Sequence, residues 1–229
     1  MLQHHRNHAI PDTLADACDP DRIALVVYDM QVGVVSQLAD GPQVTERVIR
    51  VLDAARRAGV RVFYTRHMTL PTELMGISQL RAAMAWQRKD RVEEIVSPFL
   101  RDSPGFELVP ELAPRESEAV FDKLTMSAFE GTPLEFALRD CQITAFVIVG
   151  VAMEVGIEPT VRHGADRGLI PIVVADACGA GNAAAAQRSL DALAFAGDAI
   201  MTDVATLTGL LAEPPEMDHG GDLGAVSGS

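Results

Sequence analysis

The chain contains little cysteine, fewer basic than acidic residues, and no long apolar run. Its three cysteines show no spacing typical of a zinc site, a CxxC motif or a disulfide framework, which favours a reducing, cytoplasmic compartment. No apolar stretch approaches the roughly 20 residues of a membrane-spanning helix. Nineteen Lys and Arg against 32 Asp and Glu give a net charge of −13, which argues against binding to nucleic acid or to an anionic membrane.

The remaining composition is that of a globular protein. Hydrophobic residues make up 48% and charged residues 22%, and 229 residues suit one domain. We expect a polar N-terminal arm over residues 1–21, a folded domain over 22–212, and a loose C-terminal tail over 213–229. The arm is rich in histidine, and we interpret it as a disordered or partner-clasping segment in preference to a metal site.

Strand and helix patterns alternate along the central region. Continuous apolar runs at 23–28 and 144–151 are typical of strands buried on both faces of a parallel sheet. Further strands are predicted over 60–64, 119–124, 170–175 and 199–202, and helices over 43–58, 132–139, 157–168 and 183–196, with an irregular segment at 67–118. The alternation predicts an α/β domain with a parallel sheet and right-handed crossovers, in which ligands bind beyond the carboxyl ends of the strands.

Charged residues and a glycine-containing loop stand at three of these strand ends. Asp29 follows the first strand, Lys123 lies near the end of the third, and residues 150–156 lead from the fourth strand into a helix. Alone, such an Asp is commonly a helix cap and such a Lys is commonly solvated. Together, at the ends of strands that we expect to be neighbours, they favour an Asp–Lys pair in a cleft.

These segments resemble the isochorismatase-like hydrolases, also called the cysteine hydrolase superfamily. The resemblance covers about residues 22–211. It is carried by Val27-Tyr28-Asp29-Met30-Gln31, by the run from Lys123 to Thr132, by Gly150 to Gly156, and by Asp176-Ala177-Cys178. It implies a three-layer α/β/α, Rossmann-like domain with a six-stranded parallel sheet. It also implies a homodimer or a higher homo-oligomer.

In most members the resemblance implies an Asp–Lys–Cys triad, in which a thiolate attacks an amide. Asp29 and Lys123 match its first two positions, but the third falls on Gly156, and Cys141 and Cys178 do not replace the missing thiol. Covalent amide hydrolysis is therefore not expected. Isochorismatases proper also carry glycine at this position, where the resemblance implies that the Asp protonates a vinyl ether. Such an acid needs a raised pKa, which Lys123 would oppose.

The loop after the fourth strand combines features of two branches of this family. Ala152 matches the amidase branch, whereas isochorismatases proper tend to have Tyr there, and His where this chain has Glu154. The resemblance implies a cis peptide bond between Val151 and Ala152, and an oxyanion hole made by the backbone N–H groups of Ala152 and Gly156. The alternative is an ordinary strand-to-helix turn in which Gly156 only relieves crowding.

Metal and cofactor are not expected. The metal-binding relatives have an Asp-x-His motif after the second strand, whereas this chain has Thr65-Arg66-His67. His67 is therefore predicted to contact substrate. Residues 67–118 are predicted to form a lid, on which Trp86, Gln87 and Arg88 could bind an aromatic or carboxylate ligand or pack at a dimer contact. The remaining candidate substrate-binding residues are Gln31, Phe129 and Met153.

Three functions remain open on these grounds. The first is a hydrolase without a covalent step, with Asp29 as general acid/base and Lys123 as its electrostatic partner, acting on a small substrate with a vinyl ether or a carboxylate. The second is an amide or C–N hydrolase in which Asp29 activates water. The third is a catalytically lapsed small-molecule binder, which is disfavoured because both charged residues are retained.

Overall fold

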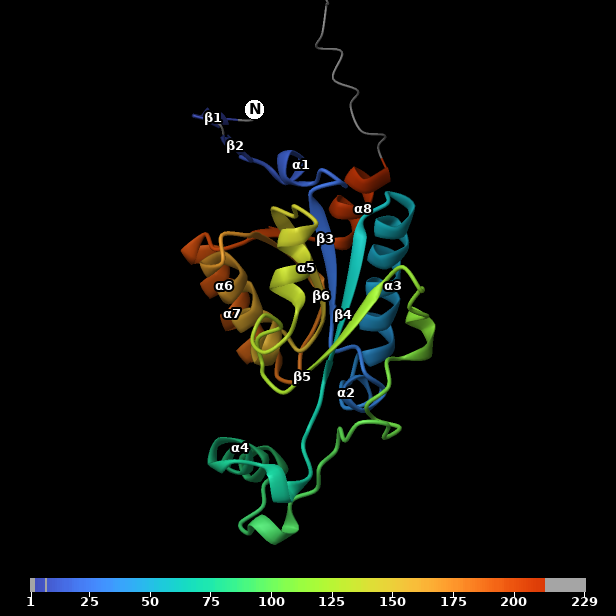
Figure 1. Cartoon of the computed structure of the whole chain (residues 1–229), viewed down its shortest axis with the longest axis vertical. Coiled ribbons are helices and arrows are strands. Elements are labelled where there is room, and N and C mark those ends of the chain that lie inside the picture. Colours follow the sequence, from blue (N-terminus) through green and yellow to red (C-terminus); the bar gives the residue numbers. More distant parts are fainter. Residues whose placement is uncertain (1–2, 7, 213–229) are drawn as a thin grey trace, which may run out of the picture.

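A six-stranded parallel sheet forms the centre of the protein (Figure 1). The computed structural model describes residues 3–6 and 8–212. The six strands are β3 (Ile23–Tyr28), β4 (Arg61–His67), β5 (Ala119–Lys123), β6 (Ala145–Val151), β7 (Ile170–Gly179) and β8 (Ile200–Thr202). Their order across the sheet is β5-β4-β3-β6-β7-β8.

This strand order places a switch point at the middle of the sheet. The chain builds outward from β3 through β4 to β5, then returns to the other side of β3 and builds outward again through β6, β7 and β8. All neighbouring pairs in this sheet are parallel. In such sheets ligands bind where the order reverses, beyond the carboxyl ends of the strands. The loops after β3 and β6 therefore lie where a ligand is expected to bind.

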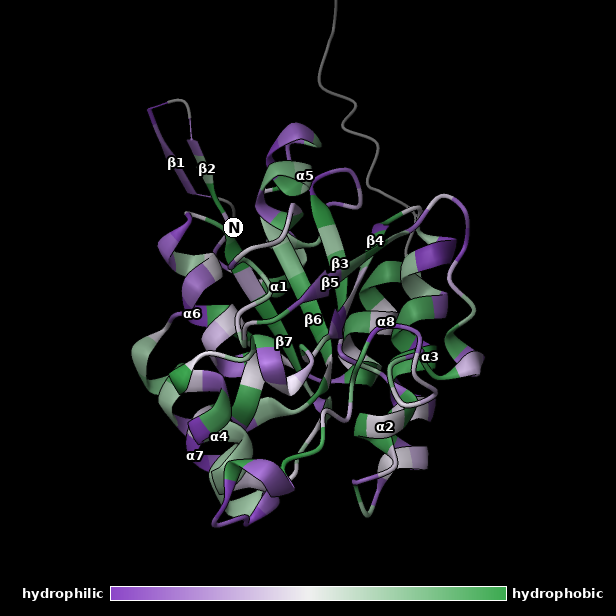
Figure 2. Cartoon of the chain, turned by 60° about the horizontal axis from the view of Figure 1, so that its bottom comes forward, coloured by the Kyte–Doolittle hydropathy of each residue, from purple (hydrophilic) through white to green (hydrophobic). Residues whose placement is uncertain are grey.

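Helices cover both faces of the sheet and complete three layers (Figure 1). One face carries α3 (Gly41–Arg57) and α8 (Val204–Ala212), and the other carries α5 (Leu134–Asp140), α6 (Glu158–Asp166) and α7 (Ala183–Ala196). Side chains alternate along β3, so that Leu25 and Val27 join the core under α3 whereas Ala24 and Val26 join the opposite core. Figure 2 shows the apolar strands between helices with polar outer faces. The predicted fold class is confirmed.

Two strands are longer than the sequence pattern predicted. β4 continues to His67 because Arg66 and His67 pair with the end of β5. β7 continues to Gly179, so Cys178 lies in this strand and pairs with Gly150, whereas we predicted it in a loop. A register irregularity in β6 between Ile148 and Gly150 accompanies this extension.

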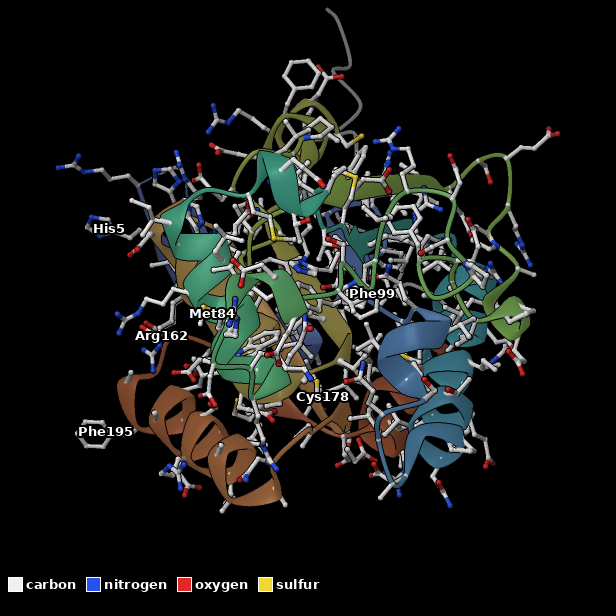
Figure 3. All side chains as sticks on the ribbon, turned by 90° about the horizontal axis from the view of Figure 1, so that it is seen from below. His5, Met84, Phe99, Arg162, Cys178 and Phe195 are labelled. Atoms are coloured by element: carbon white, nitrogen blue, oxygen red, sulfur yellow. The ribbon has the colours of Figure 1, made fainter. Side chains whose placement is uncertain are left out.

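The connection between β4 and β5 lies across the carboxyl edge of the sheet. It contains α4 (Ile77–Gln87) and three short 3₁₀ turns, Thr72–Leu74, Val92–Glu94 and Pro110–Leu112. Figure 3 looks onto this edge, with α4 in front and Phe195 projecting outward from α7. A short helix, α2 (Val32–Val35), follows β3 at the same edge. This connection is the segment predicted as a lid, and we call residues 68–118 the lid below.

The region predicted as an N-terminal arm has local structure. The strands β1 (Gln3–His5) and β2 (His8–Ile10) pair antiparallel, and all six residues are exposed. A short helix, α1 (Leu14–Ala17), follows and is capped by Thr13. The predicted tail, residues 213–229, lies outside the described residues. Within the described part of the chain, none of the helices combines the length and apolarity needed to cross a bilayer.

Candidate active site

Asp29 is fixed directly beyond the carboxyl end of β3. Its backbone has a φ of +46°, a left-handed conformation that Asp tolerates better than most residues. Its N–H donates to the Thr65 carbonyl oxygen at 3.2 Å, and its Oδ1 accepts a hydrogen bond from Thr65 Oγ1 at 2.6 Å. The residue is buried. Strand β4 thus holds the carboxylate at the edge of the sheet.

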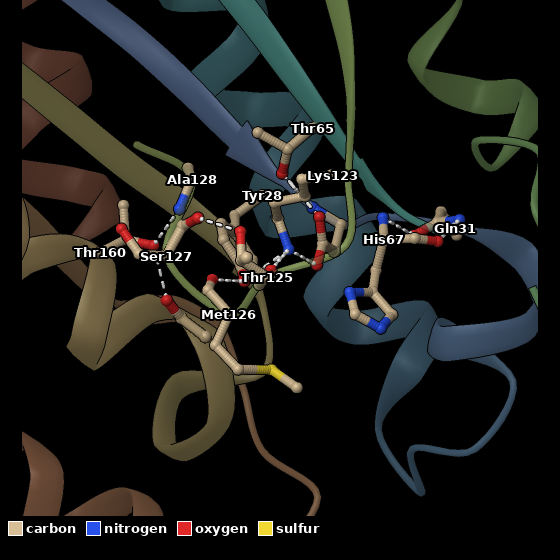
Figure 4. Close-up of polar contacts among 12 residues, drawn as sticks. Tyr28, Gln31, Thr65, His67, Lys123, Thr125, Met126, Ser127, Ala128 and Thr160 are labelled. Atoms are coloured by element: carbon tan, nitrogen blue, oxygen red, sulfur yellow. Dashed lines mark hydrogen bonds and ion pairs between the residues drawn. The ribbon is translucent and has the colours of Figure 1, made fainter. Parts of the chain in front are cut away.

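Lys123 reaches Asp29 from a strand that is not its neighbour. We expected the two residues on adjacent strands, but β4 lies between β3 and β5. The side chain of Lys123 is fully buried, and its Nζ lies 2.6 Å from Asp29 Oδ2. The same ammonium donates to Tyr28 Oη at 2.8 Å and to the Thr125 carbonyl at 3.1 Å (Figure 4). All three N–H bonds of the ammonium are therefore used within the protein.

Burial lowers the pKa of Lys123, and the Asp29 carboxylate opposes that effect. The geometry of three acceptors around one ammonium fits a protonated lysine. Lys123 therefore compensates the negative charge of Asp29, and it offers no further N–H to a ligand.

Gly156 lies in a turn that follows β6. The Val151–Ala152 peptide bond is cis, at the position that the resemblance indicated. A π-helical turn over Met153–Ile157 follows, and the N–H groups of Val155, Gly156 and Ile157 all donate to the Ala152 carbonyl at 3.1–3.2 Å. The Gly156 N–H that we predicted for an oxyanion hole is thus already hydrogen-bonded in this structure.

Gly156 also makes room for a neighbouring side chain. A Cβ atom added at this position would overlap the Tyr28 hydroxyl oxygen and would lie 2.6 Å from Tyr28 Cε1. Real Cβ atoms do not approach other heavy atoms so closely, and the fully buried Tyr28 ring has little space into which to move. The lack of a side chain at Gly156 is therefore a steric requirement of Tyr28.

Tyr28 is a second polar residue of the site, beside Thr65, that was not predicted from the sequence. Its hydroxyl donates to the Met126 carbonyl and accepts from Lys123. Burial, followed by the negative charge of Asp29, raises the pKa of the phenol well above its ordinary value. A sequence signal was present, because Tyr28 is the one polar side chain in the otherwise apolar run 23–28, immediately before Asp29.

A cavity of about 620 Å³ opens between the sheet edge and the lid. Asp29, Tyr28, Val151, Ala152 and Gly156 line its sheet side, while Trp86 and Gln87 of α4 line its lid side. Much of the remaining wall is apolar and includes Leu38, Met68, Met75, Phe99, Met126 and Val155. Among the described residues, no Lys or Arg lines this cavity.

Four predicted substrate-binding residues do not line this cavity. Phe129 packs edge-on against Phe146 with ring centroids 5.5 Å apart, and Met153 is fully buried in the same core. Arg88 ends α4 in a left-handed conformation. The side chains of Phe129 and Met153 therefore serve packing, and the backbone of Arg88 terminates α4, where we predicted substrate contacts.

Gln31, the fourth, uses its whole amide to join loops. Its Nε2 donates to the carbonyl oxygens of His67 at 3.0 Å and Phe106 at 2.8 Å, and its Oε1 accepts from the His67 N–H at 2.6 Å. The side chain is fully buried. Gln31 thus joins the loop that carries Asp29 to the backbone at His67, where the lid begins, and at Phe106 within the lid. We correct its predicted role from substrate contact to positioning.

His67 and Gln87 line the cavity in different ways. Burial, assisted by the positive charge of Lys123, lowers the pKa of His67 to about 4, and its Nδ1 is buried without a partner among the described residues. A neutral imidazole in the cavity wall can donate to or accept from a ligand. Gln87 instead exchanges hydrogen bonds with the backbone of Val96 at 2.8 and 3.0 Å. Across residues 3–6 and 8–212, no three His, Cys, Asp or Glu side chains gather as a metal site.

Comparison with known proteins assigns the chain to a family. The model of the isochorismatase domain matches residues 23–206. The chain belongs to the isochorismatase family. A ureidoacrylate amidohydrolase RutB from Methylorubrum extorquens is 32% identical over 177 residues, which cover 70% of this chain and 71% of that protein. Enterobactin synthase component B from Escherichia coli is 29% identical and is matched over 75% of this chain and 58% of its own length.

Solved structures agree with this membership of the isochorismatase family. A cysteine hydrolase from Pseudomonas syringae pv. phaseolicola superposes with a TM-score of 0.71 at 27% identity, over 85% of this chain and 94% of that one. An N-carbamoylsarcosine amidase from Thermoplasma acidophilum, at 22% identity and a TM-score of 0.65 over 80% of this chain and 96% of its own, shares the fold. The protein is a hydrolase of this family.

Proposed function

We propose that this isochorismatase-family hydrolase cleaves a C–N bond of a small, neutral substrate, with water as the attacking group and Asp29 as general base. The observation that carries the proposal is a carboxylate held by two donors at the base of an apolar cavity, beside a position that has no nucleophilic side chain. Without that nucleophile, a covalent enzyme intermediate of the cysteine type is not available.

The surroundings of Asp29 suit a base better than an acid. The Lys123 ammonium and the Thr65 hydroxyl each donate a hydrogen bond to one carboxylate oxygen at 2.6 Å. Each carboxylate oxygen accepts one of these two hydrogen bonds and keeps a further lone pair, which can take a proton. A carboxylic acid at this position would lose the attraction of the ammonium.

The proposed step conserves atoms and charge. The water oxygen attacks the substrate carbonyl carbon while Asp29 takes one water proton. The C–N bond then breaks, and the same proton passes from Asp29 to the leaving nitrogen, which yields an acid and an amine or ammonia. Stabilisation of the oxyanion by backbone N–H groups of Ala152 and Gly156 stays a prediction, and the Gly156 N–H would then turn away from the Ala152 carbonyl.

The cavity favours a substrate without a carboxylate. The Lys123 ammonium is fully hydrogen-bonded, His67 is neutral, and the described residues provide no Lys or Arg in the cavity wall. A buried anion without a cationic partner is costly. The amidohydrolase name of the relative from Methylorubrum extorquens supports C–N cleavage. The acrylate in that name is a carboxylate, for which the described lining residues offer no free Lys or Arg.

Vinyl-ether hydrolysis is the second candidate. It is favoured by Gly156, because isochorismatases proper carry glycine at the matching position. It requires Asp29 to donate a proton, which the contacts from Lys123 and Thr65 oppose. It therefore ranks below the C–N reaction.

We also propose that the protein assembles as a homodimer or a higher homo-oligomer. Large apolar side chains of the lid are exposed, among them Ile77 at 88% and Trp86 at 62%. Exposed apolar patches commonly mark protein contacts. Light scattering should give a mass of at least twice 24.5 kDa, and Ile77→Asp should lower it. A monomeric wild type would contradict this proposal.

The test of the proposed function is turnover of a defined set of compounds by the wild type and by Asp29→Asn. The set is butyramide, benzamide and phenylurea as neutral C–N substrates, N-carbamoylglycine as an anionic one, and isochorismate as the vinyl ether. Ammonia or pyruvate release is measured. We expect turnover of neutral compounds by the wild type and none by Asp29→Asn.

Asp122→Asn is the matched control for this experiment. The Asp122 carboxylate bonds Arg66 at 2.8 Å and Arg101 at 3.2 Å and does not line the cavity, so the control should keep its activity. Pyruvate release that requires Asp29, with no release of ammonia, would reverse the ranking of the two candidates. Activity that survives in Asp29→Asn would contradict the general-base role.

A further inference from the structure

The Tyr28 hydroxyl occupies the space in which a side chain of residue 156 would begin. A Cβ atom at Gly156 would overlap the Tyr28 hydroxyl oxygen and two carbons of the same ring. Gly150, which pairs with Tyr28 across the sheet, also lacks a side chain, and a Cβ there would overlap the Tyr28 carbonyl oxygen. Two glycines on the β6 side therefore let Tyr28 approach this loop closely.

The hydroxyl is held firmly and from several directions. It donates to the Met126 carbonyl, accepts from Lys123 Nζ at 2.8 Å, and its ring lies 4.3 Å from the same ammonium. Thr160 joins the two loops that flank it, because its hydroxyl donates to the Gly156 carbonyl at 2.6 Å and accepts from the Ala128 N–H at 3.0 Å. These contacts use the only proton and one of the two lone pairs of the phenol oxygen.

We propose that Tyr28 is a catalytic residue, and that the second lone pair of its hydroxyl accepts a hydrogen bond from the attacking water while Asp29 takes the other proton of that water. Tyr28, Asp29 and Gly156 line the same cavity, and Lys123 bonds both oxygen groups. The catalytic part of this inference rests on the proposed function. The steric conflict between the Tyr28 ring and a side chain at position 156 does not rest on the proposed function.

The phenol acts here as a neutral hydrogen-bonding group. A tyrosinate nucleophile would need a lowered pKa, whereas burial and Asp29 raise the pKa of this hydroxyl. The proton of the phenol stays on the oxygen and points to the Met126 carbonyl throughout the step.

A double-mutant cycle of Tm values tests this steric conflict without any substrate. The variants are Gly156→Cys, Tyr28→Val and the double variant, and their Tm values are compared with that of the wild type. We expect Gly156→Cys to lower Tm strongly in the wild-type background, and to lower it less in the Tyr28→Val background, where the ring is absent. Equal decreases in Tm in both backgrounds would overturn the steric conflict between Tyr28 and residue 156.

The same double variant gives a chemical readout. A thiol placed beside the Lys123 ammonium should be more reactive than an ordinary cysteine, because a nearby cation lowers a thiol pKa. We expect iodoacetamide at neutral pH to label position 156 in the double variant faster than Cys18, whose pKa burial raises to about 11. Peptide mass spectrometry measures both sites. Labelling of position 156 no faster than Cys18 would contradict the placement of residue 156 beside Lys123.

The catalytic role is tested with the two tyrosines of the chain. Tyr28→Phe keeps the ring and removes the hydroxyl. Tyr64→Phe is the matched control, because that hydroxyl is also buried and bonds Glu118 at 2.9 Å and Arg56 at 3.0 Å, away from the cavity. On the neutral amide that the wild type turns over, we expect Tyr28→Phe to lower kcat about 100-fold with KM within about twofold. Tyr64→Phe should lower Tm and leave kcat unchanged.

The outcomes separate the two proposals. Wild-type kcat in Tyr28→Phe, together with an inactive Asp29→Asn variant, would overturn the role of Tyr28 and leave the proposed function standing. Activity in Asp29→Asn would overturn the proposed function, and the double-mutant cycle would still decide the placement of Tyr28. Equal loss of kcat in both Tyr→Phe variants would assign the loss to stability and overturn the catalytic role.

Discussion

Removing the ammonium of Lys123 should destabilise the protein far more than removing an exposed cation. The Lys123 side chain is fully buried and that of Asp29 is 7% exposed, so Lys123→Met leaves a buried carboxylate with only the Thr65 hydroxyl for support. The Tyr28 hydroxyl and the Thr125 carbonyl lose a donor as well. Breaking one side of a buried ion pair costs about 3–5 kcal/mol, and we expect Lys123→Met to fall in that range.

The double variant Asp29→Asn/Lys123→Met should be more stable than Lys123→Met alone. It contains no uncompensated buried charge, so part of the loss is recovered although two residues have changed. Arg139→Met is the control, because Arg139 is 74% exposed and forms a surface pair with Glu135. Such surface pairs contribute about 1 kcal/mol or less.

Urea unfolding followed by far-UV circular dichroism measures these free energies. Equal losses in Lys123→Met and Arg139→Met would refute the reasoning about burial. A double variant that is less stable than Lys123→Met would refute the reasoning about the unpaired carboxylate.

Three other predictions concern two residues that line the cavity and a glycine that packs against Tyr28. His67 has a folded-state pKa of about 4 against 6.5 in the unfolded chain, so the unfolded state binds the proton first and stability falls as the pH drops from 6.5 towards 4. His67→Gln should remove up to about 3 kcal/mol of that fall in a comparison of unfolding free energies, and identical pH slopes would contradict this. Gly150→Ala should cost about 3 kcal/mol or more, since its φ is +123° and its Cβ would overlap the Tyr28 carbonyl. Gly168→Ala, with φ +81° and open space, should cost about 1 kcal/mol, and similar values would contradict the steric argument. Trp86→Ala should raise KM for a neutral amide with little change in kcat, and an unchanged KM would remove Trp86 from the binding wall.

The central strands could be predicted from the sequence because burial on two faces leaves a continuous apolar run. β3 and β6 carry such runs, and both were located within one residue of their ends. The end of β4 was missed because Thr65, Arg66 and His67 are polar, and the end of β7 was missed because Asp176 interrupts its apolar run. Arg66 and His67 belong to a strand since a neighbouring strand pairs with them, and that neighbour is distant in the sequence.

The candidate site was likewise predicted only in part. Asp29 and Lys123 were found because each follows or ends a recognisable strand, and the fold brings carboxyl ends together. The intervening β4 and the support from Thr65 could not be inferred without the strand order. Tyr28 was missed because its role depends on Gly156, which lies far along the chain.

Whether a polar residue near the site can bind a ligand also depends on how many of its hydrogen bonds the protein already uses. Gln31 follows Asp29 so closely that a substrate contact was a reasonable expectation. Both Nε2 protons are bonded to the backbone of His67 and Phe106 and the side chain is fully buried, so it has no free N–H for a ligand. Composition and spacing do not carry that information, because it depends on three loops meeting at one point.

The dependence of kcat/KM on pH tests the general-base role of Asp29 most directly. For the wild type acting on a neutral amide, we predict that kcat/KM does not increase towards acid pH, because a general base takes a proton from water only as the carboxylate. Asp29→Asn should show no turnover at any pH. An activity that instead increases towards acid pH and requires Asp29 would contradict this account, and would show that Asp29 acts as a proton donor.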